Sequence, residues 1–286
     1  MRLGYNTNGL AHHNPAEGLQ LLADLGYQSV AITLDHGWLN PFARDFARQL
    51  TAMRRLLDGL NLRSAIETGA RFLLDPRQKH EPTLVSPDEE GRRRRVEYLK
   101  RAIVAARALG SDCVSLWSGV VHDEAPWEKV QERLLGGLKE VADYAGEQHV
   151  SLGFEPEPGM AIDGMERCGE LFAALPHPML QLTLDVGHLH CQGETPLAEQ
   201  IRRWGPRLVN VHIEDMRRGV HEHLQFGEGE IDFPPVLAAL AESGYRGGLH
   251  VELSRHSHMA PEAARRAAEF LRPLIAAVGS GPAAKS

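Results

Sequence analysis

The chain has 286 residues, of which 43% are hydrophobic and 24% are charged, and its formal net charge is −7. This composition is typical of a globular protein that is long enough to bury a core without disulfides or a structural metal. The acidic balance argues against a nucleic-acid binder, because such proteins neutralise phosphates with Lys and Arg. We therefore expect a small-molecule partner and no nucleic acid.

The cysteines and the apolar runs indicate in which cellular compartment the protein is expected. Cys113, Cys168 and Cys191 stand far apart with no CxxC spacing, which predicts neither a disulfide framework nor a cysteine zinc site. No run approaches the roughly 18 apolar residues of a membrane span, and the first residues lack the apolar core of a signal peptide. We expect a cytoplasmic protein with no membrane partner. The oligomeric state stays open, a homo-oligomer included.

Short β-like runs alternate with helical stretches from one end of the chain to the other. Eight runs are predicted as strands: RLGYN (2–6), QSVAITL (28–34), LRSAIE (62–67), CVSLW (113–117), VSLGFE (150–155), LQLTLD (180–185), RLVNVH (207–212) and GGLHVE (247–252). Helical spacing fills segments between and after them, for example 16–26, 88–109, 127–147 and 261–278. Three residues stand at N-cap positions beside early prolines and mark helix starts: Asn14, Asp88 and Asp232.

This order of elements predicts a (β/α)8 barrel, since eight βα units fit into about 275 residues. A doubly wound open sheet is the alternative, but the first strand is followed by Asn6-Thr7-Asn8-Gly9 and not by a glycine-rich phosphate loop. No linker composition interrupts the chain. We expect a single barrel domain over residues 1–278 and a flexible tail over 279–286, where the residues are small and polar.

The last four predicted strands end in ionisable residues, which are Glu155, Asp185, His212 and Glu252. The C-terminal ends of barrel strands form the active-site face, so these side chains are expected to meet at one mouth. Each follows an apolar stretch, where an unpaired charge would be costly. Three carboxylates and one imidazole suit Mn²⁺, Mg²⁺, Co²⁺ or Zn²⁺. The simpler alternative is that each pairs with an Arg or Lys of a loop.

A second glutamate follows the fifth predicted strand in the sequence FEPEPG. Pro156 has no N–H to give to a parallel ladder, so we expect the strand to end there. We assign Glu155, at the strand end, to the metal. Glu157, on the loop, is assigned to substrate binding or to orienting a ligand, and the reverse assignment is the alternative.

The order Glu…Asp-x-Gly-His…His-x-x-Asp…Glu resembles the xylose isomerase-like barrel superfamily. That superfamily includes sugar isomerases and epimerases, inosose and dehydroshikimate dehydratases, and apurinic endonucleases. The architecture matches along the whole chain, and the specific motifs lie in the second half, in LGFEPEPG, LTLDVGHLH, VNVHIEDMRRG, QFGEGEIDF and GGLHVELSRH. The resemblance implies that Glu155, Asp185, His212 and Glu252 are metal ligands. It also implies that Glu155 and Glu252 act as an acid/base pair.

The resemblance extends to substrate contacts. It implies that His188 holds a substrate oxygen and that Arg217 is a substrate-binding arginine, with Arg218 equally placed by spacing. His223, expected in the loop after the seventh strand, is a further candidate for substrate contact. In the endonuclease branch an Asp-x-His at this place holds an extra zinc together with the histidine that matches His188. Here His221 stands at the aspartate position, so a second metal site of His188, His221 and His223 is the alternative.

The chemistry that these residues support is proton transfer beside a carbonyl. A divalent ion on the carbonyl and neighbouring hydroxyl stabilises the enediolate, and a carboxylate moves the proton. We predict a divalent-metal-dependent isomerase or epimerase of a sugar or polyol-derived carbonyl compound, with one metal ion and room for a second. A dehydratase of a keto-polyol shares the first step and is the alternative.

Two further readings are weaker. A multinuclear zinc phosphodiesterase of the endonuclease type would need histidines at the ends of the third and fourth strands, and AIETGARF and SLWSGVVHD have none there. A barrel without catalytic function would have lost at least one of the four predicted ligands, and all four are present.

Overall fold

The computed structural model describes residues 1–279. Eight parallel strands close into a barrel in the order β1-β10-β7-β6-β5-β4-β3-β2, which confirms the predicted single-domain (β/α)8 fold and rules out the open sheet. The barrel strands are β1 (Arg2–Asn6), β2 (Ser29–Thr33), β3 (Arg63–Glu67), β4 (Val114–Leu116), β5 (Leu152–Phe154), β6 (Leu180–Asp185), β7 (Leu208–Ile213) and β10 (Gly248–Val251).

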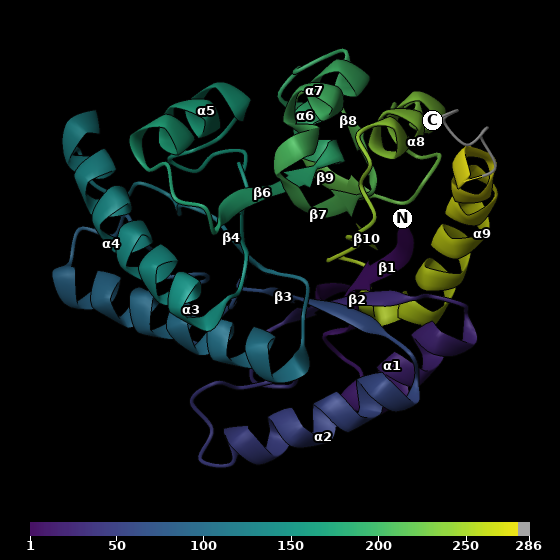
Figure 1. Ribbon diagram of the computed structural model, residues 1–286, viewed down its shortest axis with the longest axis horizontal. Coiled ribbons are helices and arrows are strands. Elements are labelled where there is room, and N and C mark those ends of the chain that lie inside the picture. The colour runs from purple at the N-terminus through teal and green to yellow at the C-terminus, as the bar shows by residue number, and fades with distance from the viewer. Residues whose placement is uncertain (280–286) are drawn as a thin grey trace.

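Helices surround this barrel (Figure 1). They are α1 (Pro15–Asp24), α2 (Phe46–Gly59), α3 (Glu89–Leu109), α4 (Trp127–Gln148), α5 (Met165–Ala174), α6 (Val186–Cys191), α7 (Leu197–Trp204), α8 (Phe233–Glu242) and α9 (Ala260–Gly279). Side chains cap two of the predicted helix starts: Asn14 accepts a hydrogen bond from the Ala16 N–H, and Asp88 accepts one from the Gly91 N–H. Asp232 stands at the N-cap of α8 but makes no such bond.

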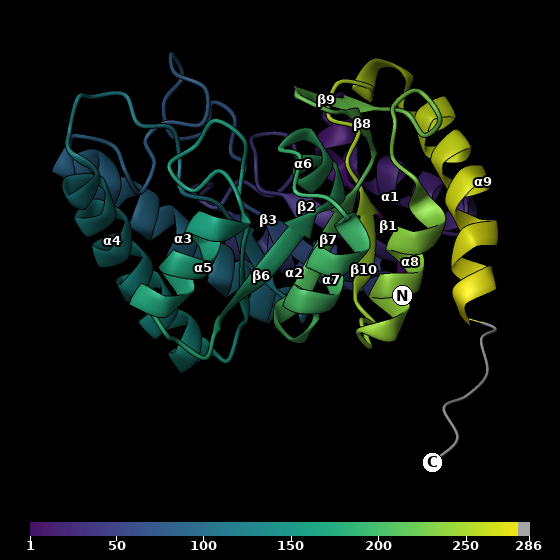
Figure 2. The same cartoon turned by 90° about the horizontal axis from the view of Figure 1, so that it is seen from above.

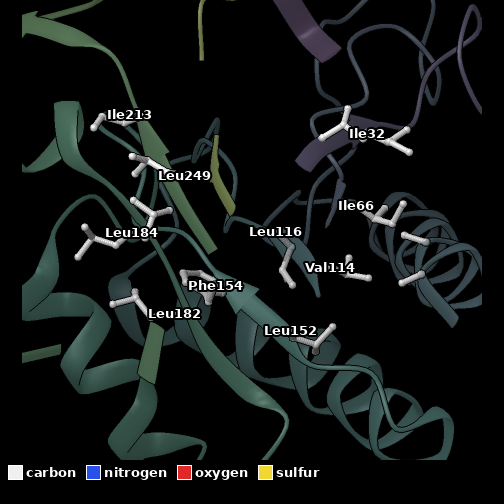
Figure 3. Packing of buried hydrophobic residues seen from close by; sticks show 14 of the residues in the cluster. Ile32, Ile66, Val114, Leu116, Leu152, Phe154, Leu182, Leu184, Ile213 and Leu249 are labelled. Atoms are coloured by element: carbon white, nitrogen blue, oxygen red, sulfur yellow. The ribbon is translucent and has the colours of Figure 1, made fainter. Parts of the chain in front are cut away.

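Alternation along the strands separates the core from the mouth. Leu182 and Leu184 of β6 are buried among apolar side chains of neighbouring strands, as Figure 3 shows beside Phe154 of β5. Asp185 is the next residue after Leu184, so the pleat turns it toward the barrel interior. The same period on β7 buries Val211 and Ile213 in the apolar cluster, and it leaves the intervening His212 for the interior face.

An antiparallel hairpin, and not the expected irregular loop, follows β7. Its strands are β8 (Asp215–Arg217) and β9 (Val220–Leu224). Gly219 in the turn has a φ of +74°, a backbone conformation that costs a glycine little. His221 and His223 lie two residues apart on β9, so their side chains leave the same face of the hairpin.

The hairpin, the short helix α6 and the loop after β3 lie at the same edge of the barrel (Figure 2). This edge holds the C-terminal ends of the strands. At the other end of the chain, α9 extends to Gly279, the first residue of the predicted tail, and residues 280–286 lie outside the described part. No helix within residues 1–279 is both long and apolar enough to cross a membrane.

Candidate active site

The four predicted metal ligands meet at the mouth of the barrel. One ligand atom from each of Glu155, Asp185, His212 and Glu252 lies within 4.8 Å of the others. His212 is at the centre, because its Nδ1 lies 2.9 Å from Oε1 of Glu155 and 2.9 Å from Oε2 of Glu252. The barrel order places β7 between β10 and the β6–β5 pair, so the two glutamates reach the imidazole from strands on either side of it.

Backbone hydrogen bonds fix both glutamates just past their strands. The N–H of Glu155 donates to the carbonyl of Leu116, and the N–H of Glu252 donates to the carbonyl of Ile213. Each ladder therefore continues one residue beyond the strand itself. Pro156, which lacks an N–H, follows Glu155, as the sequence led us to expect.

The donor set fits a divalent cation. Its three carboxylates lie close together in a nearly buried position, where their mutual repulsion is strong. Oδ2 of Asp185 is buried and has no hydrogen-bond partner within residues 1–279. Within the same residues no Arg or Lys forms an ion pair with any of the four, so the alternative of separate loop partners is wrong. Oxygen donors with one imidazole suit a hard or borderline divalent ion.

A buried chain of polar side chains orients His212. Its Nε2 lies 2.9 Å from Oε1 of Glu67, which also accepts a hydrogen bond from Asn210. Asn210 in turn accepts from Nδ1 of His250, whose Nε2 bonds to the Ser29 hydroxyl. A proton on Nε2 of His212, donated to Glu67, would leave the Nδ1 lone pair for a cation bound between the imidazole and the two glutamates. The sequence marked Glu67 as a strand end but gave no sign of this role.

The pKa values of the cluster diverge in the metal-free protein. Burial raises the pKa of Glu155 to about 7, and His212 offsets only part of that rise. Burial also acts on Glu252, yet the nearby His212 imidazole outweighs it and holds the pKa of Glu252 well below its usual range. For His212 the negative charges of Glu155 and Glu67 overcome burial and raise its pKa well above the ordinary value.

Three histidines stand next to the four-residue cluster. The ring centroids of His188, His221 and His223 lie 4.8 to 5.8 Å apart, and Nε2 of His188 is 3.1 Å from Nε2 of His221. Nε2 of His188 also lies 3.5 Å from Oδ2 of Asp185, so the two groups adjoin. One ring nitrogen of each histidine lies within 4.8 Å of the others, so the three could hold a cation.

Burial and nearby charged groups determine the protonation states in the three-histidine cluster. Burial lowers the pKa of His188 to about 4, which leaves its imidazole neutral. Burial also opposes a charge on His223, but Glu214 outweighs it and raises the pKa of His223 to about 10. Glu214 is fully buried and lies 3.7 Å from Nδ1 of His223. Nothing in the sequence pattern around Glu214 indicates this role.

A cavity of about 440 Å³ is lined by most of the two clusters, but not by Asp185 or His188. This volume lies within the usual range for small-molecule sites. Glu157 lines it, and its Oε2 lies 3.8 Å from Nδ1 of His188. Burial raises the pKa of Glu157 well above its ordinary value. The remaining lining residues are Asn6, Asn8, Thr33, Glu67, Gly69, Arg71, Lys79, His80, Trp117, Glu155, Met160, His212, His221, His223, Glu252, Ser254 and Arg255.

Arg217, one of the predicted substrate contacts, lies outside this cavity. Its side chain is exposed on β8 and donates to the carbonyl of Glu228. The alternative by spacing, Arg218, is also exposed, and its backbone N–H donates to Glu230. The hairpin fold turns the Arg217 side chain toward the QFGEG turn and the Arg218 guanidinium toward Gly193, and the sequence spacing could not show this.

Comparison with known proteins agrees with the architecture. The profile of the family described as xylose isomerase-like TIM barrel matches residues 19–274. The L-ribulose-5-phosphate 3-epimerase UlaE of Salmonella paratyphi C (strain RKS4594) is 27% identical over 266 residues, covering 92% of this chain and 90% of that protein. The solved structure of a D-tagatose 3-epimerase-like protein superposes with a TM-score of 0.80 at 20% identity, over 98% of each chain. The IOLI protein, solved with a binding zinc atom, gives a TM-score of 0.77 at 20% identity, over 98% of this chain and 100% of that one. This chain belongs to the xylose isomerase-like TIM barrel family.

Proposed function

We propose that the protein is a divalent-metal-dependent epimerase of a ketose. The observation that carries the proposal is the convergence of Glu155, Asp185, His212 and Glu252 at the barrel mouth, where all but Asp185 line a small-molecule cavity. The similarity to an L-ribulose-5-phosphate 3-epimerase over most of both chains supports a sugar epimerase or isomerase. The four residues would hold the cation, which would polarise the substrate carbonyl next to the carbon that loses its proton.

Glu155 and Glu252 are the proposed acid/base pair. Both line the cavity, and they come from strands on opposite sides of β7. A carboxylate on each side of the bound ketose can remove the proton from one face of a carbon and return a proton to the other, which inverts that carbon. Glu155 is buried and only 15% of the Glu252 side chain is exposed, which limits the access of bulk water to the carbon while it lacks its proton.

Substrate hydroxyls are assigned to Glu157, His188 and His223. Glu157 and His223 line the cavity, whereas His188 does not line it and lies 3.8 Å from Glu157 and 3.1 Å from His221. A neutral His188 can donate one hydrogen bond and accept another, whereas a charged His223 only donates. Substrate binding by Arg217 stays a prediction from the sequence. The exposed position of its side chain does not support that prediction.

The alternative to substrate binding by these histidines is that His188, His221 and His223 bind a second metal ion. The short separation between the Nε2 atoms of His188 and His221 supports it. Metal analysis of the purified protein decides between the two uses. One ion per chain, unchanged in His221→Ala, supports substrate binding by the histidines. Two ions, with one lost in His221→Ala and both kept in the surface control His258→Ala, support the second site.

The function is tested by following ketose epimers by NMR with chelator-treated and Mn²⁺-reloaded protein. We expect interconversion of C-3 epimers only after reloading, and none with Glu252→Gln. A new absorbance from a dehydrated product, without epimer formation, would identify the dehydratase instead. Cleavage of abasic DNA would identify a phosphodiesterase. The cytoplasmic location, the identity of the metal and any homo-oligomer stay predictions.

A further inference from the structure

Three cationic side chains line the same cavity as the carboxylates. They are Arg71 and Lys79, from the loop after β3, and Arg255, from the loop after β10. The barrel order runs β10-β1-β2-β3 on this side, whereas three of the four proposed metal ligands come from β5, β6 and β7. This side, from β10 to β3, is the basic arc of the cavity, although the carboxylates of Glu67 and Glu252 also line the cavity there.

Hydrogen bonds hold the basic side in place. The N–H of His80 donates to the carbonyl of Arg71 at 2.6 Å, which closes the loop and brings Lys79 beside Arg71. The Arg71 guanidinium donates to the carbonyl of Asn8, and the Asn8 amide donates to Oε1 of Glu252 at 2.6 Å. One residue, Asn8, therefore connects the cationic side directly to the proposed acid/base residue.

Much of this positive charge has no anionic partner. Within residues 1–279 neither Arg71 nor Lys79 forms an ion pair with a carboxylate, and only Arg255 of the three does, at 3.1 Å from the partly exposed Glu222. Partial burial and the charges of Arg71 and Arg255 together lower the pKa of Lys79. Like charges gathered at a cavity wall are relieved by an anionic ligand.

We propose that Arg71, Lys79 and Arg255 bind the terminal phosphate of the substrate, so that the substrate is a ketose phosphate and not a free ketose. This rests on the proposed epimerase function. A phosphate monoester carries close to two negative charges and three acceptor oxygens, which matches three cations better than a single carboxylate does. A ketose phosphate held in this way would place its phosphate on the basic arc and its carbonyl toward the metal ligands.

The test compares L-ribulose 5-phosphate with L-ribulose as substrates of the metal-loaded protein. We expect a higher kcat/KM for the phosphate ester. Lys79→Ala and Arg255→Ala should each lower the ratio of the two kcat/KM values by about tenfold, the usual effect of losing one charge-assisted contact. Arg77→Ala is the matched control, because Arg77 belongs to the same loop, is highly exposed and does not line the cavity. Its ratio should stay at the wild-type value.

Equal or better turnover of L-ribulose would overturn the phosphate assignment and leave the epimerase function standing. A preference for a ketose with a terminal carboxylate would overturn it as well. Turnover of neither ketose would instead count against the proposed function. In that case, calorimetry on the metal-free protein still tests the phosphate site. Tighter binding of L-ribulose 5-phosphate than of L-ribulose, lost in Lys79→Ala and kept in Arg77→Ala, would support it, and equal affinities would overturn it.

Discussion

Nε2 of His212 lies 2.9 Å from Oε1 of Glu67, on the edge of the ring opposite the Nδ1 that faces Glu155 and Glu252. The carboxylate fixes the ring plane and favours the tautomer that offers Nδ1 as a ligand. Glu67 is buried on β3, which is remote from β7 in the barrel order, so the contact crosses the barrel interior. The proposed metal site would therefore depend on a residue outside its four proposed ligands.

Replacing Glu67 should weaken metal binding without removing a ligand. We expect Glu67→Leu to lower the affinity for Mn²⁺ or Zn²⁺ by about 10- to 100-fold, the usual effect of losing an orienting carboxylate. Glu67→Gln keeps an acceptor oxygen and should lose less. Competition with a fluorescent chelator measures both affinities. Equal affinities for Glu67→Leu and wild type would show that His212 needs no orienting partner.

Much of this site could be predicted from the sequence, because strand-end residues are visible in it. Glu155, Asp185, His212 and Glu252 each end an apolar run, and a barrel brings such ends together whatever its loops do. The barrel topology alone predicts that these four residues converge, without any information on side-chain contacts.

The residues that the sequence analysis missed depend on tertiary structure. Arg71 and Lys79 reach the cavity only because the loop after β3 folds back on itself, and an irregular loop has no periodicity to reveal this. The β8–β9 hairpin was expected to be a loop, since its charged and polar residues show no apolar alternation. Arg217 fits the spacing of a substrate contact, yet the hairpin directs it to the Glu228 carbonyl.

Replacing Glu155 should weaken metal binding more than replacing Glu157 does. Glu155 faces Nδ1 of His212, whereas Glu157 faces His188 and the cavity. We expect Glu155→Gln to lower metal affinity by about 100-fold or more, and Glu157→Gln by less than about tenfold, with its main loss in kcat/KM. Isothermal titration with Mn²⁺, beside steady-state kinetics, gives both values. The opposite order of affinities would establish the reverse assignment.

Metal removal should destabilise the protein through the same four residues. A ligand that binds only the folded state adds about 2.7 kcal/mol at a concentration 100 times its Kd, which corresponds to a rise of several degrees in Tm for a chain of this size. Calorimetric scans with EDTA and with Mn²⁺ measure this rise. Asp185→Asn should abolish it, while Asp143→Asn, an exposed partner of Lys139, should retain it. A full rise in Asp185→Asn would exclude Asp185 as a ligand.

Asp215 should stabilise the turn after the hairpin. Its buried carboxylate accepts backbone hydrogen bonds from Met216, Gly227 and Ile231. We expect Asp215→Ala to lower the free energy of unfolding by about 2–4 kcal/mol, because three backbone N–H groups, those of Met216 and Ile231 buried, lose a charged acceptor. Asp232→Ala is the control, since its side chain makes no capping bond, and should change stability by less than about 0.5 kcal/mol. Urea unfolding measures both, and equal losses would remove Asp215 from this role.

The most direct test of a metal-dependent proton transfer is solvent deuterium incorporation. L-ribulose 5-phosphate is incubated in D2O with Mn²⁺-loaded protein, with EDTA-treated protein and with Mn²⁺-loaded Glu252→Gln, and the C-3 proton is followed by NMR. We expect loss of that signal with the loaded wild-type protein alone, accompanied by the C-3 epimer. Exchange that continues undiminished in EDTA or in Glu252→Gln would contradict it.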